Sequence, residues 1–198
     1  MQSFASDTLQ KIHDKYAWSM EAAAAEGLIP YKSQGTKWIG PPFEGNSWWT
    51  NGFWPALMWQ LYTATKEERF LTEARRVQEL LKIELVRHDM LHHDVGFMFL
   101  LSLGTDWRLT GDREALRQTL IAADVLAGRY NPAGFIRAWN GKGREGWAIV
   151  DCLMNLPLLY FAWEQTGDPR YLNIAKCHAD TAIRYFLRED GSCNHIVI

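Results

Sequence analysis

The sequence has no long hydrophobic run, since none of its apolar stretches reaches the roughly 18 to 20 residues that a membrane-spanning helix needs. It also lacks an excess of one charge, with 21 basic against 23 acidic residues, so neither a nucleic-acid surface nor an anionic-membrane surface is expected. Its first ten residues lack a basic region followed by an apolar stretch, and we expect no secretory signal. Cysteine is scarce: Cys152, Cys177 and Cys193 are odd in number and follow no metal-ligand spacing, which favours reduced thiols in a cytoplasm.

The pattern of strands is missing as well. No segment combines strict polar–apolar alternation with β-branched residues and flanking turns, whereas apolar residues recur at helical spacing along most of the chain. The sequence therefore predicts an all-α fold. A first helix carries Leu9, Ile12, Tyr16 and Met20 on one face and ends before Gly27. Further helices are predicted near 53–65, 67–87, 95–110, 112–130, 151–166 and 169–187.

A short motif repeats between predicted helices. Thr110-Gly111-Asp112 and Thr166-Gly167-Asp168 each combine a glycine that ends one helix with an aspartate that starts the next, and Thr65-Lys66-Glu67 takes the same place in a degraded copy. The helix before each motif is strongly apolar, and the helix after it has a charged face. This asymmetry predicts α-hairpins with an inner and an outer ring of helices, as in an α/α toroid.

The repeat also predicts where polar residues meet. Asn51, Asp94 and Asp151 each precede an apolar inner helix by a similar spacing, so parallel inner helices would bring them to one end of the toroid. The loops expected at that end hold half of the ten tryptophans, an unusual number: Trp38, Trp48, Trp49, Trp139 and Trp147. Because indole faces stack on sugar rings while carboxyl groups transfer protons, the pattern indicates a carbohydrate site.

Each aspartate also has an ordinary structural interpretation. Asp94 and Asp151 could both be helix N-caps. Asp151 lies among apolar residues, and a buried carboxylate needs a hydrogen-bond partner or a raised pKa. Two facing carboxyl groups would have pKa values that move apart, so one could remain protonated as a general acid while the other stays ionised. The type of sugar chemistry depends on the distance between the carboxyl groups, which the sequence does not give.

Other chemistries fit less well. His88, His92, His93 and Asp94 could form a metal site, but the segment around His88 looks like a loop, so no metal is predicted and His93 is expected to orient a substrate or Asp94. Cys152 has no basic partner nearby in the sequence and is expected in the core. The glycines between 134 and 146 lack the strand-then-helix context of a phosphate-binding loop. Core positions are also expected for the tryptophans inside helical stripes: Trp54, Trp59, Trp107 and Trp163.

Several stretches resemble the unsaturated glucuronyl hydrolases, glycoside hydrolase family 88. They occur in the order typical of the family and span nearly the whole chain, whereas the related unsaturated rhamnogalacturonyl hydrolases are less similar in the loops. The stretches are WWTNGFWPALMWQLY (48–62), HHDVGFMFLLS (92–102), NPAGFIRAWN (131–140), IVDCLMNLPLLY (149–160) and EQTGDPRYLNIAKCHAD (164–180).

The resemblance implies an (α/α)6 barrel, of which residues 1–198 would form the N-terminal half as an incomplete barrel of about seven helices. It implies a substrate with a 4,5-unsaturated glucuronic acid at the non-reducing end, as polysaccharide lyases leave behind, and no metal or organic cofactor. The reaction would hydrate the vinyl ether and release the neighbouring sugar. By the same resemblance, Asp151 is the general acid and base and Asp94 its catalytic partner. The implied sugar-binding residues are Trp49, Phe53, His93, Phe97, Trp139 and His195.

The chain is about half as long as a twelve-helix barrel requires. Three explanations stay open: a fragment of a longer product, a truncated and inactive relative, or half-barrels that complete each other by self-association through exposed apolar flanks. Two rival functions also remain. One is a carbohydrate-binding or vestigial module without turnover, and the other is a sugar epimerase or isomerase that would depend on His93 or His195 instead of Asp151.

Overall fold

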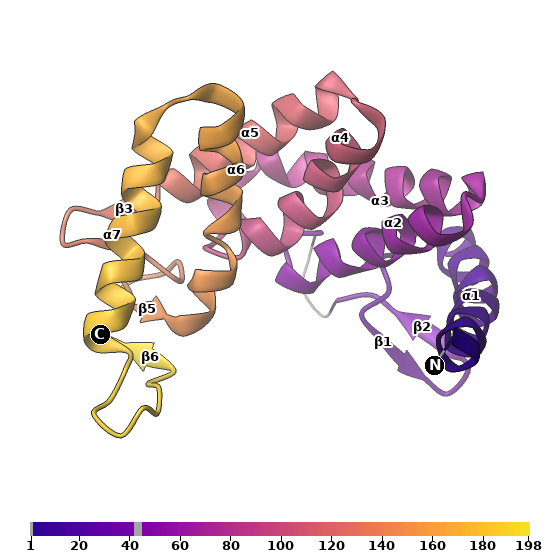
Figure 1. Cartoon of the computed structure of the whole chain (residues 1–198), viewed down its shortest axis with the longest axis horizontal. Coiled ribbons are helices and arrows are strands. Elements are labelled where there is room, and N and C mark those ends of the chain that lie inside the picture. Colours follow the sequence, from indigo (N-terminus) through magenta and orange to yellow (C-terminus); the bar gives the residue numbers. More distant parts are fainter. Residues whose placement is uncertain (1, 42–44) are drawn as a thin grey trace.

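The computed structural model describes residues 2–41 and 45–198. Its helices stand side by side in an arch that runs from α1 at the N-terminal end to α7 at the C-terminal end (Figure 1). The α-helices are α1 (Gln2–Ala25), α2 (Phe53–Thr65), α3 (Glu68–Val86), α4 (Thr105–Thr110), α5 (Arg113–Ala127), α6 (Pro157–Thr166) and α7 (Pro169–Tyr185). Four tighter or wider helical segments accompany them: the 3-10 helices η1 (Trp49–Gly52), η2 (His88–Met90) and η4 (Val150–Met154), and the π-helix η3 (Gly96–Gly104).

Two concentric arcs of helices build the arch. The apolar segments α2, η3 and α6 pack in series, since η3 contacts both α2 and α6, while the amphipathic helices α3, α5 and α7 pack in series behind them. Buried residues of the inner arc include Trp59, Phe99 and Leu159, and α3 turns Phe70 and Val77 into the same core. The predicted all-α toroid with an apolar inner ring and an amphipathic outer ring is therefore confirmed.

The three repeated turns have one geometry. Gly111 and Gly167 adopt left-handed conformations with φ of 75° and 72°, and Lys66 does the same with φ of 61°. In each copy the threonine hydroxyl donates to the carbonyl four residues earlier and accepts the backbone N–H two residues later. Asp112 then caps α5 by accepting from the backbone N–H groups of Glu114 and Ala115, as a good N-cap does.

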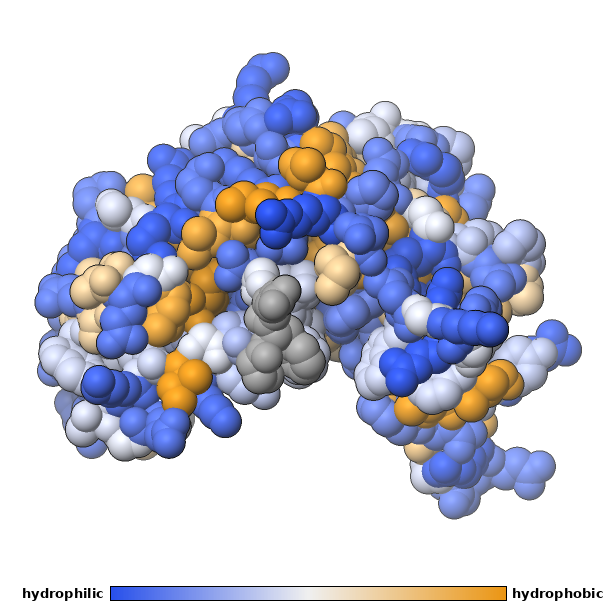
Figure 2. Space-filling view, turned by 180° about the vertical axis from the view of Figure 1, so that it is seen from behind, coloured by the Kyte–Doolittle hydropathy of each residue, from blue (hydrophilic) through white to orange (hydrophobic). Residues whose placement is uncertain are grey.

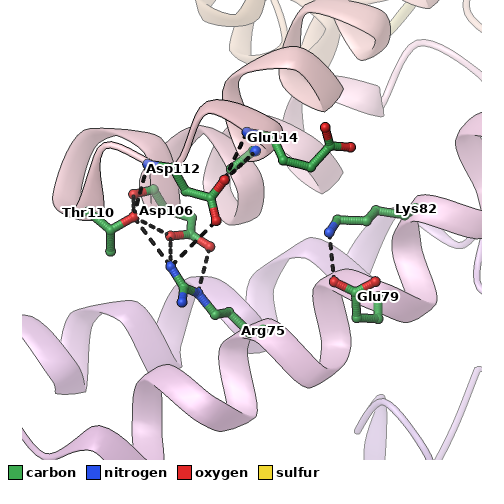
Figure 3. Close-up of polar contacts among 8 residues, drawn as sticks. Arg75, Glu79, Lys82, Asp106, Thr110, Asp112 and Glu114 are labelled. Carbon is green, nitrogen blue, oxygen red and sulfur yellow. Dashed lines mark hydrogen bonds and ion pairs between the residues drawn. The ribbon is translucent and has the colours of Figure 1, made fainter.

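Near one of these turns, a polar cluster ties the two arcs together (Figure 3). Arg75 on α3 donates from Nε and Nη2 to the carboxylate of Asp106 on α4, at 3.1 and 2.9 Å. The Thr110 hydroxyl donates to the same carboxylate at 2.7 Å. Asp106 is buried, so this fork of charge-assisted hydrogen bonds offsets the cost of removing its charge from water.

In the described residues, strands occur in the connections between helices and in the C-terminal tail. The pairs are antiparallel and short: β1 (Lys32–Gln34) with β2 (Lys37–Ile39), β3 (Tyr130–Asn131) with β4 (Phe135–Ile136), and β5 (Ala148–Ile149) with β6 (Ile196–Val197). The expectation that a sheet is improbable holds for the core but missed these ladders, which are too short to show an alternating pattern. The last pair matters most, because it brings the C-terminal tail beside the segment that precedes Asp151.

Two predicted helices prove to be composite. The segment expected as one helix over 95–110 is a π-helix followed by α4, and the segment over 151–166 is a 3-10 helix followed by α6. Pro157 causes the second break: it starts α6 at a position where its missing N–H costs no intrahelical bond.

Apolar side chains are exposed near both ends of the arch. Phe4 and Trp18 on α1 are exposed at one end, and Met154 and Ile183 at the other. The space-filling view from behind shows the arch with a hollowed underside and apolar patches among polar residues (Figure 2). Trp163 is 38% exposed, so its expected core position is wrong, whereas Trp54 and Trp59 are buried as expected. No helix in the described ranges is both long and apolar enough to cross a membrane.

Candidate active site

Close backbone contacts set the inner segments against each other at one end of the arch. A Cβ added to Gly52 would overlap the carbonyl oxygen of Phe97, and one added to Gly96 would lie 2.7 Å from the Cα of Asn155. The side-chain oxygen of Asn155 also accepts from the backbone N–H of Phe97 at 2.8 Å, and its amide group donates to the carbonyl of Asp151 at 3.4 Å. These contacts bring the segments that carry Asp94 and Asp151 together.

Asp94 lies just before η3 and is almost fully buried. Nδ1 of His92 lies 2.7 Å from one of its carboxylate oxygens, and Nε2 of His93 lies 3.5 Å from the other. Among the described residues, these two imidazoles are the ion-pair partners of the Asp94 side chain. The first turn of η3 has no side-chain cap. The N-cap interpretation of Asp94 is therefore not what the structure has.

Asp151 lies in η4, opposite Asp94. Nε2 of His93 lies 3.7 Å from its Oδ2, so the same imidazole nitrogen faces both carboxyl groups, which also lie close enough to hydrogen-bond to each other. One polar atom from each of His93, Asp94 and Asp151 lies within 4.8 Å of the others. The side chain of Asp151 is 39% exposed, less buried than its apolar sequence neighbours suggested. It can therefore meet a ligand.

The two carboxyl groups have pKa values that move in opposite directions. Burial, together with the negative charge of Asp94, raises the pKa of Asp151 to about 6, while His195 acts the other way. Burial also acts to raise the pKa of Asp94, but hydrogen bonding to His92 and the nearby His93 hold that pKa below its ordinary value. The pair thus has one carboxyl group that binds a proton near neutral pH and one that stays ionised.

His93 is fully buried beside these groups. Burial lowers the pKa of its imidazole to about 4, although the charge of Asp94 acts in the opposite direction. The ring is therefore neutral at pH 7, and its Nε2 faces both carboxyl groups. A neutral imidazole can relay or orient a proton without neutralising the carboxylate of Asp94.

Aromatic rings lie next to the carboxyl pair. Trp49, Phe53 and Phe97 form a cluster in which the ring centroids are 5.5 to 5.9 Å apart. Phe97 belongs to η3, the segment that Asp94 directly precedes, and Phe53 is exposed. Trp49 and Phe53 also line a groove of about 370 Å³ that extends toward Tyr31 and Trp38. This surface offers flat apolar faces beside groups that can transfer a proton.

The remaining predicted residues reach the site through loops. Trp139 is 38% exposed and stacks on Trp147 at 6.2 Å, and the preceding residue, Ala138, accepts from the backbone N–H of His93. The carbonyl of His195 accepts from the N–H of Val150 at 3.0 Å, which places the tail beside Asp151. The structure thus gathers all eight predicted site residues at one end of the arch.

A metal site was considered for the histidines around Asp94. Within the described ranges, the acidic and imidazole groups that come close enough to share an ion are His93, Asp94 and Asp151. His88 lies on the exposed helix η2 and is not one of them. The buried thiol of Cys152 has a pKa raised by burial, so it behaves as a core residue, as expected.

Known proteins are similar in sequence to most of this chain. The chain is 40% identical over 173 residues to an unsaturated glucuronyl hydrolase of Bacillus sp. (strain GL1), and 38% identical over 158 residues to an unsaturated chondroitin disaccharide hydrolase of Streptococcus pneumoniae. These matches cover 84% and 78% of this chain. The chain is a homologue of the unsaturated glucuronyl hydrolases. No protein-family model matches it.

Solved structures of unsaturated glucuronyl hydrolases share the fold. The crystal structure of the enzyme from Bacillus sp. GL1 matches 90% of this chain with a TM-score of 0.80 at 37% identity, and that from Streptococcus agalactiae matches 95% with a TM-score of 0.81 at 30% identity. A variant of the S. agalactiae enzyme was solved in complex with dGlcA-GalNAc6S. The chain spans less than half of the curated relatives it matches, 45% and 40% of their lengths.

Sequence reasoning missed the residues that hold the candidate site together. Asn155 bridges the segments of Asp151 and Phe97, and Gly52 and Gly96 allow neighbouring inner segments to touch. A signal was present, because the pair Gly-Phe occurs at 52–53 and again at 96–97, just after Asn51 and Asp94. Two glycines at equivalent positions of a repeat point to a close backbone approach.

Proposed function

We propose that this chain supplies the catalytic pair of a hydrolase that removes a 4,5-unsaturated glucuronic acid from the non-reducing end of oligosaccharides. The observation that carries the proposal is the close pair Asp94 and Asp151, which lies beside the neutral imidazole of His93 and whose pKa values move apart. The homology to unsaturated glucuronyl hydrolases supports the substrate class. Because the chain spans about half of those relatives, the activity of the whole protein is part of the proposal.

The proposed reaction hydrates the vinyl ether of the unsaturated sugar. Asp151, whose raised pKa of about 6 keeps a fraction of its carboxyl groups protonated near neutral pH, donates its proton to C4, and positive charge develops at C5 and the ring oxygen. The ionised carboxylate of Asp94 stabilises that charge. Water adds to C5 and gives a proton to the carboxylate of Asp151, which regenerates the acid. The resulting hemiketal opens and releases the neighbouring sugar, so one water is consumed in each turnover.

The aromatic residues are proposed to hold the sugar. Trp49, Phe53 and Phe97 offer ring faces for the apolar side of the unsaturated ring, and Trp139 offers another at the edge of the site. His93 and His195 lie where they could bind polar groups of the substrate near Asp151. This assignment needs no metal or organic cofactor, because proton donation and charge stabilisation come from side chains.

The open ends of the arch are relevant to the oligomeric state in which the protein would be active. Exposed apolar residues at both ends, such as Trp18 and Met154, would be covered if a second copy or the remainder of a longer protein completed the ring. We propose self-association for the isolated chain, which light scattering on a size-exclusion column would detect as a mass of twice that of one chain. A reducing cytoplasm is the proposed location, since Cys152, Cys177 and Cys193 are free thiols.

The deciding experiment is turnover of an unsaturated chondroitin disaccharide, followed by loss of the ultraviolet absorbance of the vinyl ether. We expect absorbance loss with the native chain, none with Asp151→Asn, and native behaviour with Asp180→Asn, an exposed aspartate on α7. Equal turnover by the native chain and by Asp151→Asn would contradict the assigned acid, and if His93 or His195 substitutions abolished it, an epimerase or isomerase would be favoured.

A second candidate follows from the length of the chain. Because it spans less than half of its curated relatives, it could bind unsaturated oligosaccharides through its tryptophans without turning them over. Calorimetry that shows binding of the disaccharide, together with constant absorbance, would establish this non-catalytic role.

A further inference from the structure

Arg129 links two loops at the site end of the arch. It follows the C-terminus of α5, and its guanidinium donates to the carbonyl of Arg137 at 2.9 Å, to that of Leu91 at 3.0 Å and to that of Ala138 at 3.0 Å. A fourth bond, of 2.9 Å, reaches the side-chain oxygen of Asn140. One half-buried side chain therefore fastens the segment before His92 to the segment around Trp139.

The acceptors of Arg129 stand on both sides of His93. Ala138 O, which takes a bond from the guanidinium, also accepts from the backbone N–H of His93 at 3.2 Å. Leu91 O, two residues before His93, receives bonds from both Arg129 and the amide of Asn140. The backbone that presents His93 and Asp94 to Asp151 is thus held through carbonyl groups that Arg129 fixes.

The charge of Arg129 also acts on this segment. Burial lowers its pKa to about 10, which leaves the guanidinium cationic at neutral pH. Within the described part of the chain no carboxylate forms an ion pair with it, so backbone carbonyl dipoles solvate the charge. Burial is the main reason why the pKa of His93 is lowered, and the charge of Asp94 opposes this effect. The positive charge of Arg129, like His92 and His178, lowers that pKa further.

We propose that Arg129 is a positioning residue for the acid–base pair, which it serves by holding His93 and Asp94 in register with the loop of Trp139. The inference rests on the proposed function for the identity of the pair, but the geometry that it invokes does not depend on turnover. Arg129 does not bind substrate in this scheme. A planar guanidinium can satisfy four acceptors at fixed angles, which a lysine ammonium cannot.

The test compares Arg129→Lys and Arg129→Gln with Arg137→Gln in the full chain. Arg137 lies in the same loop, but its guanidinium donates only to Gly141 O among the described acceptors, so it is a matched control. Imidazole nitrogen spectra of the ¹⁵N-labelled chain report the tautomer and environment of His92 and His93. Steady-state kinetics on the unsaturated disaccharide report kcat and KM separately, and circular dichroism reports the fold.

We expect Arg129→Lys to keep its helical spectrum, to shift the His92 and His93 signals, and to lower kcat by about ten- to 100-fold with a smaller change in KM. Arg137→Gln should leave both the signals and kcat unchanged. Native imidazole signals in Arg129→Lys would overturn the proposal, and so would loss of the helical spectrum, because Arg129 would then support the whole fold. If the native chain does not turn over the disaccharide, the proposed activity fails while the imidazole spectra still decide the role of Arg129.

Discussion

Helices are joined differently at the two ends of the arch. At one end, the Thr-Gly-Asp turns at 110–112 and 166–168 close each hairpin with bonds between residues no more than four positions apart. At the other end, connections run from 87 to 95 and from 128 to 149, and their bonds join residues far apart in the sequence. The carboxyl pair and the exposed aromatic rings lie at this second end.

The contrast shows how one scaffold separates stability from chemistry. The turn end buries Asp106 against Arg75, a partner on the neighbouring helix, and caps α5 with Asp112, so its charges have hydrogen-bond partners. The site end leaves Asp151 half exposed and raises its pKa, which is unfavourable for the ionised side chain but useful for proton donation. Substitutions at the two ends should therefore have different signatures.

The largest difference between the two ends is expected when the charge of one aspartate is removed. Asp94→Asn should lower kcat by about 10²- to 10⁴-fold, because the ionised partner of the general acid is lost. The same change should lower the pKa of Asp151, since the charge of Asp94 helps to raise it. Kinetics across pH would measure both effects. Asp112→Asn at the turn end keeps a capping side chain and should change neither kcat nor the pKa of Asp151. Equal losses of kcat in both variants would show that the turn end and the site end do not have separate roles.

Glycine substitutions should test how tightly the inner segments pack at the site end. Gly52→Ala at the site end would force a methyl group into the backbone of η3 and should lower the free energy of unfolding by about 1–3 kcal/mol, as measured by urea denaturation. Gly146 has open space around it and no left-handed conformation, so Gly146→Ala is the control and should be nearly neutral. If Gly52→Ala were as stable as native, the close contact of the inner segments would be refuted.

The same contrast explains what could be predicted from the sequence. Turns, caps and the apolar inner helices depend on neighbouring residues, so Gly111, Asp112 and the alternation of apolar and amphipathic helices were readable in advance. The three β-pairs of the described residues and the bonds of Asn155 and Arg129 depend on partners far along the chain, which periodicity does not specify, whereas the break at Pro157 follows from the proline itself. Asp94 and Asp151 were placed together only because the repeat fixed a common register, and their pKa values required the folded environment.

The pH dependence of turnover should follow the site-end pKa shifts. Only the protonated form of Asp151 can donate, so activity should fall about tenfold for each pH unit above the pKa of about 6. It should also fall at acidic pH, as Asp94 becomes protonated below its ordinary range. Buffers from about pH 3 to pH 8 at constant ionic strength would follow the whole basic limb and the start of the acidic limb, which lies below the ordinary pKa of an aspartate. A rate independent of pH between 5 and 8 would contradict the division of roles, and Asp112→Asn should give the native profile.

The smallest effect is expected at the turn end, in the degraded copy of the repeat. Lys66 adopts a left-handed conformation that the other two copies give to glycine, and such a conformation strains a side chain with a Cβ. Lys66→Gly should raise the free energy of unfolding by about 0.5 kcal/mol, because relief of that strain exceeds the loss of the weak contact between Lys66 and the Tyr62 ring. Thermal and urea unfolding would measure the gain. Lys176→Gly, on an exposed face inside α7, should instead destabilise by about 1 kcal/mol. A destabilised Lys66→Gly variant would mean that the turn is held by its side chain, whereas a gain without any change in kcat would show that the turn end can be improved without cost to the site.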